Sequence, residues 1–350
     1  MDKMDQLDEL TARPLAIVGA GVLGQAYAAL LAAHGQAVTL LATPRTAAQL
    51  ITAGLVRLRG AVALDVVAAP APAPPGVVGV TTDPAHLPAH AGLIFATKGH
   101  QLATAIASVR AAWPAPDDRL AWVAGIQNGV VKDDQLAAAF GAGRVVGGAT
   151  IMAGQRQPDG TVTVATRGMT FLGELAGRPS PRVATAAALL QAAGIPTTVP
   201  EDIRSVIWSK ACNAAGVFGV SALTRAPAAA IFQVPEFLAA YLALIRETAA
   251  IGAAEGAPVG DYPGFPPIKT YVERPDAETF AALLPPPDTP RTIGGGWPSM
   301  TQDLLAGRPF EAEAVFGDFV ARGERAGLPV PRLTLVRDLL CGLNALQEEK

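Results

Sequence analysis

The sequence predicts an α/β protein with an N-terminal doubly wound sheet, followed by an all-α C-terminal domain. Three observations support this. A strand, a glycine-rich turn, a helix and a second strand follow one another from Leu15 to Thr43, apolar strand-like runs continue to about residue 200, and mainly helical segments follow Pro200. We therefore expect a flexible tail at 1–13, a first domain at 14–200 and a second at 201–350.

Composition narrows the function classes. Half of the 350 residues are hydrophobic, the net charge is −3, and Lys and Arg are scattered, which gives no sign of a nucleic acid or membrane partner. The first 13 residues carry four acids and no apolar core, unlike a secretory signal. Cys212 and Cys341 lie far apart in apolar surroundings, so we expect neither a disulfide framework nor a metal site, and a cytoplasmic location.

The glycine-rich turn predicts a dinucleotide site. Gly19, Gly21 and Gly24 form G-x-G-x-x-G directly after the strand Leu15–Val18. Gly19 allows the sharp turn, Gly21 allows close approach of a pyrophosphate, and Gly24 allows the helix to pack on the strand. The helix N-terminus then offers free N–H groups to phosphate, which adds Val22 and Leu23 to the expected cofactor contacts and makes the domain Rossmann-type.

The end of the second strand favours NADPH over NADH. An NAD enzyme usually carries an acid here for the ribose 2′-hydroxyl, but this chain has Thr43 and Arg45, which could meet a 2′-phosphate. Alternatively, Arg45 merely opens a surface helix.

Polar residues follow two further strands. Lys98 comes after Leu93–Ala96, and Asn128 after Leu120–Ile126, at the strand ends that face the crevice of an open sheet. On spacing alone, Lys98 could equally start a helix, and Asn128-Gly129 could be a plain turn. The remaining strands are expected at Leu55–Leu58, Val145–Met152, Thr161–Val164, Thr170–Glu174 and Thr197–Val199, with a Pro/Ala-rich loop at Ala68–Val77 and a helix at Arg182–Ala193.

The second half contains an unusual lysine. Lys210 enters an apolar helix, where an ammonium is costly unless paired, although it could also extend to the surface along its own aliphatic stem. Long loops rich in Pro and Gly are expected between Gly256 and Pro298. The expected helices are Asp202–Ala215, Pro235–Glu255, Glu278–Leu284, Pro298–Ala306, Ala312–Ala326 and Thr334–Leu346.

These motifs resemble the ketopantoate reductase (2-dehydropantoate 2-reductase) family nearly end to end. The matching segments are Gly19–Gly24, Thr97-Lys98, Gln127-Asn128-Gly129, the helix Ile203–Lys210, and a late block, Ser299-Met-Thr-Gln-Asp followed by Gly307-Arg-Pro-Phe-Glu311. The late block is the most specific of them.

The resemblance implies NADPH-dependent reduction of a 2-oxo acid to a 2-hydroxy acid, in pantothenate biosynthesis for the family's own substrate. Lys210 matches the general acid, and Glu311 the glutamate that orients the substrate. Ser299 matches the serine that holds the substrate carboxylate, and Lys98 the cofactor-side lysine. Asn128 lies between cofactor and substrate by this match, and Glu311 is also expected to touch the cofactor.

The chain departs from the family at two positions on the lysine helix. Asparagines one and two turns after the lysine are replaced by Ala214 and Phe218, while Asn213 is one residue off, rotated by about 100°. Asn213 remains a candidate substrate ligand, and the apolar wall predicts an altered substrate. The alternatives are a non-catalytic dinucleotide-binding regulatory protein and a 3-hydroxyacid dehydrogenase relative. A homodimer is also expected.

Overall fold

The computed structural model describes residues 14–88, 92–113, 120–286, 289–290 and 294–348, so the expected tail at 1–13 lies outside the described residues. The chain divides into two compact units. Residues 1–127 and 132–203 form one, which we call the sheet unit. Residues 128–131 and 204–350 form the other, the helical unit.

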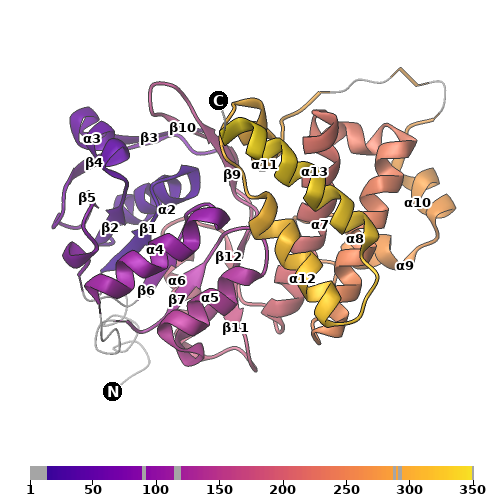
Figure 1. Cartoon of the computed structure of the whole chain (residues 1–350). Helices are drawn as coiled ribbons and strands as arrows, with labels where there is room; N and C mark the ends of the chain where they lie inside the picture. Colours follow the sequence, from indigo (N-terminus) through magenta and orange to yellow (C-terminus); the bar gives the residue numbers. More distant parts are fainter. Residues whose placement is uncertain (1–13, 89–91, 114–119, 287–288, 291–293, 349–350) are drawn as a thin grey trace. The chain divides into compact units, whose positions relative to one another are not determined.

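The sheet unit is built on one mixed sheet whose centre is parallel (Figure 1). Its strands run in the order β12-β11-β8-β7-β6-β1-β2-β5-β4-β3-β10-β9. The first strand lies between β2 and β6 and is parallel to both. The strands are β1 Leu15–Val18, β2 Val38–Leu41, β3 Leu55–Gly60, β4 Leu64–Pro70, β5 Val78–Thr81, β6 Gly92–Phe95, β7 Val123–Gly125, β8 Val145–Thr150, β9 Ala153–Arg156, β10 Val162–Thr166, β11 Thr170–Glu174 and β12 Thr197–Thr198.

Helices cover both faces of this sheet, which confirms the doubly wound prediction. Alternation along β1 shows how: Leu15 and Ile17 pack into one core cluster with α2, α3 and α6, whereas Ala16 and Val18 pack into another with α4 and α5. All four residues are buried because helices lie on each side. These helices are α2 Val22–Ala33, α3 Pro44–Ala53, α4 Gly99–Ala112, α5 Val131–Phe140 and α6 Pro181–Ala192.

The loop prediction at 68–77 was wrong at its start, and the strands β5 and β9 were not predicted. The start of the expected loop at 68–77 belongs to β4, which pairs antiparallel with β3 and parallel with β5. The polar segment Ala153–Arg156 forms β9, antiparallel to β10, with mostly exposed side chains. In β4, the buried residues Val66 and Ala68 alternate with more exposed ones, whereas β9 is mostly exposed and is held by backbone hydrogen bonds to β10.

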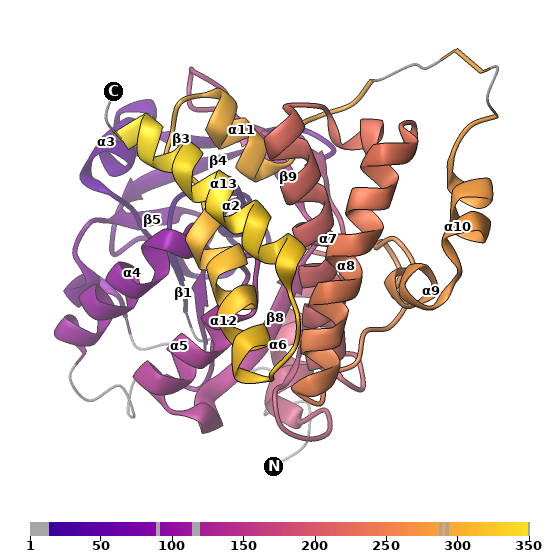
Figure 2. The same ribbon diagram turned by 45° about the vertical axis from the view of Figure 1, so that its right-hand side comes forward.

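The helical unit is organised around α7 (Ile203–Thr224) and α8 (Pro235–Ala254), which lie side by side in both views (Figures 1 and 2). The expected end of α7 at Ala215 was wrong by more than two turns. Gly216 and Gly219 do not end the helix; a Cβ there would lie 2.4 Å from the ring of Tyr241 and 2.9 Å from Leu244. Close packing of α8 therefore explains these glycines.

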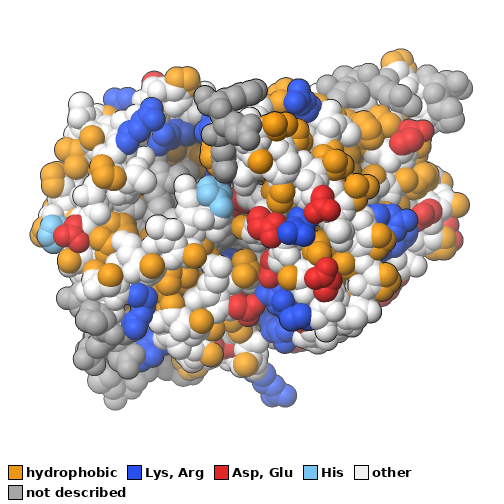
Figure 3. Space-filling view, viewed as in Figure 1, with side chains coloured by type: hydrophobic (Ala, Val, Ile, Leu, Met, Phe, Trp, Pro, Cys, Tyr) orange, Lys and Arg blue, Asp and Glu red, His pale blue; other side chains and the backbone are white. Residues whose placement is uncertain are grey.

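The remaining helices of this unit are shorter. They are α9 Ile268–Glu273, α10 Asp276–Leu283, α11 Ser299–Leu305, a π-helical turn Glu313–Gly317 that runs into α12 Asp318–Arg325, and α13 Pro331–Glu348. Buried Glu247 on α8 accepts the backbone N–H groups of Arg332 and Leu333 and thereby fixes the start of α13. Acidic and basic side chains mix over α12 and α13 in Figure 3, and the ion pair Arg337–Glu313 joins α13 to the π-helical turn.

Two helices are long and apolar enough to cross a membrane by length and composition alone. They are α7 and α8, and 78% and 56% of their most apolar windows are buried inside the protein. Core helices of soluble proteins share these properties. Cys212 and Cys341 are both free. Among the residues that the structure describes, no group of three His, Cys, Asp or Glu side chains could hold a metal ion.

Candidate functional site

The glycine-rich turn is tightly packed at its first and third glycines. Gly19 has a φ of +107°, and a Cβ there would lie 2.8 Å from the backbone nitrogen of Thr97. At Gly24, a Cβ would lie 1.8 Å from the carbonyl oxygen of Gly19. Since these distances exclude any side chain, both positions need glycine for the fold itself.

The second glycine has a different environment. A Cβ at Gly21 would meet only the carbonyl oxygen of Ala96, at 3.9 Å. Gly21 is exposed, and as the N-cap residue of α2 it offers no side-chain oxygen to the first N–H groups of that helix, including those of Val22 and Leu23. Open space beside an uncapped helix N-terminus suits a pyrophosphate, so this turn fits a dinucleotide.

The end of β2 contains no carboxylate. Thr43 is the N-cap residue of α3, where its hydroxyl accepts the N–H of Thr46 at 3.4 Å. Arg45 is exposed in the first turn of that helix. The Arg45 side chain therefore takes no part in capping α3, whereas the Thr43 hydroxyl already accepts the N–H of Thr46.

The next crevice residues follow β6 and β7. Lys98 is half-buried and forms the N-cap position of α4. Beside it in sequence, Thr97 accepts a hydrogen bond from Nε2 of Gln127 at 3.2 Å. Gln127 is 5% exposed, and its Oε1 has no partner among the described residues. Sequence reasoning missed Gln127 as a site candidate, although the Gln-Asn-Gly motif contained it.

On α7, the predicted acid lies on the least buried face. Lys210, Asn213 and Val217 are half-buried and are spaced three and four residues apart, whereas the residues around them are buried. Ala214 and Phe218, one and two turns after Lys210, are 6% and 7% exposed at the margin of the same face. An ammonium and an apolar margin therefore share one side of this helix.

Asn213 is turned toward α8. Its Oδ1 accepts a hydrogen bond from the hydroxyl of Tyr241 at 3.0 Å. Burial raises the pKa of Tyr241, with a smaller contribution from Tyr271, so the phenol stays a neutral donor at any physiological pH. This bond fixes the Asn213 amide, and Tyr241 is a second residue that the sequence did not single out.

Asn128 and Glu311 belong to segments that contact each other within the helical unit. Gly129, next to Asn128, has a φ of +80°, and its Cβ position lies 3.7 Å from the carbonyl oxygen of Ala314 and 3.9 Å from Val315. Glu311 is 3% exposed, one turn before Val315, just ahead of the π-helical turn. Such turns recur at functional sites.

Ser299 is the first residue of α11 and is half-buried. This helix is joined to α7 by a hydrogen bond of 3.1 Å between Thr301 and Ser221. Ser221 follows Lys210 by about three turns on the same side of α7. The structure therefore brings the helix that carries Ser299 to the face that carries Lys210, at a point further along its length.

The late sequence block is largely a scaffold. Asp303 accepts two hydrogen bonds from the guanidinium of Arg308, at 3.0 and 2.8 Å, and the Gln302 amide donates to the carbonyl of Trp297. The Phe310 N–H donates to Asn344 on α13. These contacts fix the loop between α11 and Glu311 at both ends.

The predicted site residues fall into two sets. Gly19, Gly21, Val22, Leu23, Gly24, Thr43, Arg45 and Lys98 belong to the sheet unit. Asn128, Lys210, Asn213, Ser299 and Glu311 belong to the helical unit.

A mixed sheet with a parallel centre and a glycine turn, followed by a helical unit, is the architecture of a two-domain dinucleotide-binding protein. Residues 15–177 match the family model Ketopantoate reductase PanE/ApbA, and residues 202–344 match Ketopantoate reductase PanE/ApbA C terminal. The chain belongs to the ketopantoate reductase family.

Individual relatives agree. The 2-dehydropantoate 2-reductase of Archaeoglobus fulgidus is 30% identical over 225 residues, 63% of this chain and 69% of that protein. The solved PanE/ApbA family ketopantoate reductase from Ralstonia eutropha JMP134 is 25% identical, with a TM-score of 0.75 over 96% of this chain and 99% of that one. The ternary structure of D-mandelate dehydrogenase with NADH and anilino(oxo)acetate, at 19% identity, shares the fold, with a TM-score of 0.76 over 96% and 99% of the two chains.

Family membership makes this protein an oxidoreductase that acts on CH–OH groups with a nicotinamide dinucleotide.

Proposed function

We propose that this protein reduces a 2-oxo acid to the 2-hydroxy acid with NADPH, in the cytoplasm. Residues 14–200 hold the cofactor and residues 201–350 hold the substrate and pair two copies into a homodimer. The observation that carries the proposal is Lys210, an ammonium on the least buried face of an otherwise buried helix. Buried Glu311 lies in the same unit.

The chain's own groups have distinct roles in this proposal. NADPH supplies a hydride to the carbonyl carbon of the substrate. Lys210 polarises the carbonyl with its positive charge and gives a proton from Nζ to the oxygen as the C=O π bond becomes a C–O bond. Neutral Lys210 then regains a proton from solvent. Ser299 binds the substrate carboxylate, Glu311 orients the substrate and supports the lysine, and Asn128 contacts both molecules.

We further propose that the substrate has an apolar side chain. Ala214 and Phe218 occupy the positions where the family's asparagines bind the polar end of ketopantoate, and they make this margin apolar. An apolar margin leaves a substrate hydroxyl without a partner, which costs binding energy.

The test is a steady-state comparison of ketopantoate, 4-methyl-2-oxopentanoate and phenylglyoxylate with NADPH. We expect the two apolar acids to give the higher kcat/KM. Efficient turnover of ketopantoate alone would show that the altered-substrate proposal is wrong. If NADPH binds and no 2-oxo acid causes its oxidation, the protein is a regulatory dinucleotide-binding protein instead.

Restoring the two asparagines is expected to reverse the preference. Ala214→Asn with Phe218→Asn should raise the kcat/KM ratio of ketopantoate to 4-methyl-2-oxopentanoate by about tenfold or more, because amides would again meet a polar substrate end. The matched control is Leu223→Asn, a half-buried position on the opposite side of α7. A ratio that stays constant in the double variant would remove these residues from the substrate pocket.

Arg45 is expected to select NADPH. Arg45→Gln should raise KM for NADPH by about tenfold, with little change for NADH, since only NADPH carries the phosphate that a guanidinium would bind. The control is Arg59→Gln, an exposed arginine of the same unit that is paired with Asp65. Equal effects on both cofactors would argue that Arg45 only begins α3.

A further inference from the structure

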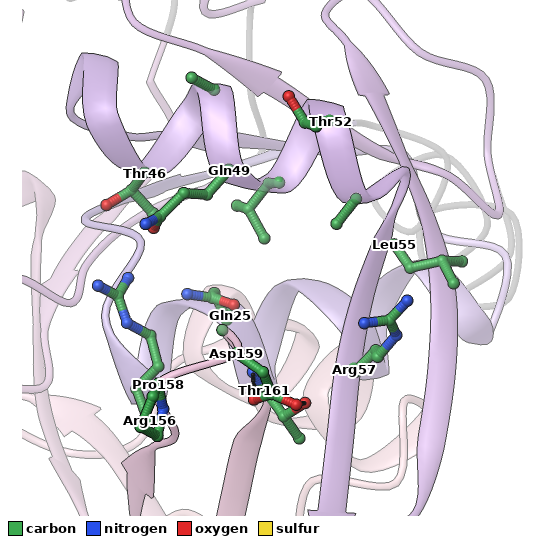
Figure 4. Close-up of a pocket in the computed structure, with 14 residues that line it drawn as sticks. Gln25, Thr46, Gln49, Thr52, Leu55, Arg57, Arg156, Pro158, Asp159 and Thr161 are labelled. Carbon is green, nitrogen blue, oxygen red and sulfur yellow. Dashed lines mark hydrogen bonds between the residues drawn. The ribbon is translucent and has the colours of Figure 1, made fainter.

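A cavity of about 440 Å³ lies within the sheet unit, and none of the predicted cofactor residues is among those that line it (Figure 4). Its walls come from α3, the first residues of β3, and the end of β9 with the turn that leads into β10, while α2 contributes the floor. The cavity is lined by Gln25, Thr46, Ala48, Gln49, Leu50, Thr52, Ala53, Leu55, Arg57, Arg156, Pro158, Asp159, Gly160 and Thr161.

Gln25 on the floor presents an unsatisfied acceptor. The residue is 1% exposed, and its Nε2 donates to the carbonyl oxygen of Ala20 at 2.8 Å. Because Nε2 is engaged in this way, Oε1 cannot exchange places with it without setting two acceptors together. Oε1 is buried and has no hydrogen-bond partner among the described residues. A buried acceptor of this kind is costly until a donor reaches it.

Two guanidinium groups face the same space. Arg57 from β3 is half-buried, and Arg156 from β9 is exposed and extends toward Thr46 and Gln49 in Figure 4. Neither forms a hydrogen bond or ion pair with any residue in the part of the chain that the structure describes. Cationic side chains on either side of a cavity attract a carboxylate, which a guanidinium can bind through two parallel hydrogen bonds.

The remaining lining limits the ligand further. Asp159 is the one acid, and its oxygens accept the N–H and the hydroxyl of Thr161 at 2.9 and 3.0 Å. These bonds lower the pKa of Asp159, which keeps it charged but occupied. The cations therefore outnumber the anion. Leu50, Leu55 and Ala53 add an apolar wall, so the cavity combines a cationic rim, an apolar side and a buried acceptor.

We propose that this cavity is a second ligand site, which binds a small carboxylate that also carries an N–H or O–H donor and an apolar group. The carboxylate binds Arg156 at one side of the cavity, the donor reaches Oε1 of Gln25, and the apolar group packs on Leu50 and Leu55. Arg57, at the other side, adds its positive charge to the attraction for the anion. Gln25 holds Ala20 within the glycine-rich turn, so the ligand also restrains that turn.

The test is calorimetric titration of the NADPH-saturated protein with two probes. N-acetyl-L-leucine has a carboxylate, an amide N–H and an apolar side chain; 4-methylpentanoate keeps the carboxylate and the apolar chain but lacks the donor. We expect N-acetyl-L-leucine to bind at one site, and 4-methylpentanoate to bind about tenfold more weakly because Gln25 then stays unsatisfied. Equal affinities for the two probes would contradict the role of Gln25.

Substitutions in the cavity lining test whether the probe binds there. Arg57→Gln and Arg156→Gln should each lower the affinity for N-acetyl-L-leucine by about tenfold. Arg59→Gln, on the same face of β3 but outside the cavity lining, should leave this affinity unchanged. Phe218→Asn changes the proposed substrate pocket and should also leave the affinity for N-acetyl-L-leucine unchanged, which distinguishes the two sites. The proposal fails if the wild-type protein does not bind the probe, or if both arginine variants bind it normally. It also fails if these two variants raise KM for NADPH by the same factor, because the cavity would then be part of the cofactor site.

Discussion

Replacing Lys210 by alanine is expected to lower kcat by about 1,000-fold or more, with little change in NADPH affinity. The variant loses both the proton donor and the positive charge that stabilises the developing alkoxide. Nucleotide affinity should persist because the glycine turn belongs to the other unit. Steady-state oxidation of NADPH at saturating 2-oxo acid gives kcat, and fluorescence titration gives the affinity for NADPH.

Two further variants sharpen this prediction. Lys210→Arg keeps the charge but is a poor acid, since a guanidinium does not release its proton in proteins. We expect it to preserve substrate affinity better than kcat. Lys269→Ala removes an exposed lysine of the same unit that lies 4.0 Å from Glu273, and it should behave as wild type. A normal kcat in the Lys210→Ala variant would show that Lys210 is not the general acid.

Replacing Gly21 by alanine is expected to lower the affinity for NADPH by about 100-fold, while the melting temperature of the unliganded protein stays constant. The added methyl group meets only the Ala96 carbonyl, at 3.9 Å, so the fold accepts it. The pyrophosphate, however, needs the space that the methyl group takes. Differential scanning fluorimetry without ligand and titration with NADPH measure the two effects separately.

Gly24→Ala should behave differently. Its Cβ would lie 1.8 Å from the Gly19 carbonyl oxygen, so we expect the free energy of unfolding to fall by about 3 kcal/mol. The affinity for NADPH should fall as well. Gly143→Ala, where nothing lies within 4 Å of the Cβ position, is the matched control and should change neither property. If Gly21→Ala binds NADPH as wild type does, the turn is not a pyrophosphate site.

Local signals were sufficient for the nucleotide-binding end of the fold. The apolar strand β1, the helix α2 and the second strand β2 were each predicted from residues within a few positions of one another, and Gly35, with a φ of +80°, follows the end of α2. The strand, turn, helix and second strand follow one another within about 30 residues, so the sequence pattern contains them, although Gly19 also packs against Thr97 far along the chain.

Long-range packing explains what was missed. The glycines of α7 predict an early helix end, but Tyr241 and Leu244 of a later helix occupy the space that their side chains would need. The expected single helix at 312–326 begins instead with a π-helical turn. In each case a residue far away in sequence, or a local change of helical pitch, decides the geometry, and no spacing rule records it.

The candidate site divides in the same way. Positions of Gly19, Gly21 and Gly24 follow from one motif, whereas the roles of Lys210, Glu311 and Ser299 rested on resemblance to a family and remain predictions. Gln127 shows the limit most clearly, because only the fold reveals its buried Oε1 and its bond to Thr97. A glutamine in a sequence gives no sign of an unsatisfied acceptor.

The segment Asn128–Val131 belongs to the helical unit although its neighbours on both sides belong to the sheet unit, so the chain passes between the units three times. During synthesis, this segment can adopt its native packing only after Ala314 and Val315, its neighbours near the other end of the chain, have been made. A sheet unit released early, or cut off after residue 203, would lack these packing partners. Any chimera that exchanges the helical half must therefore transplant these four residues with it.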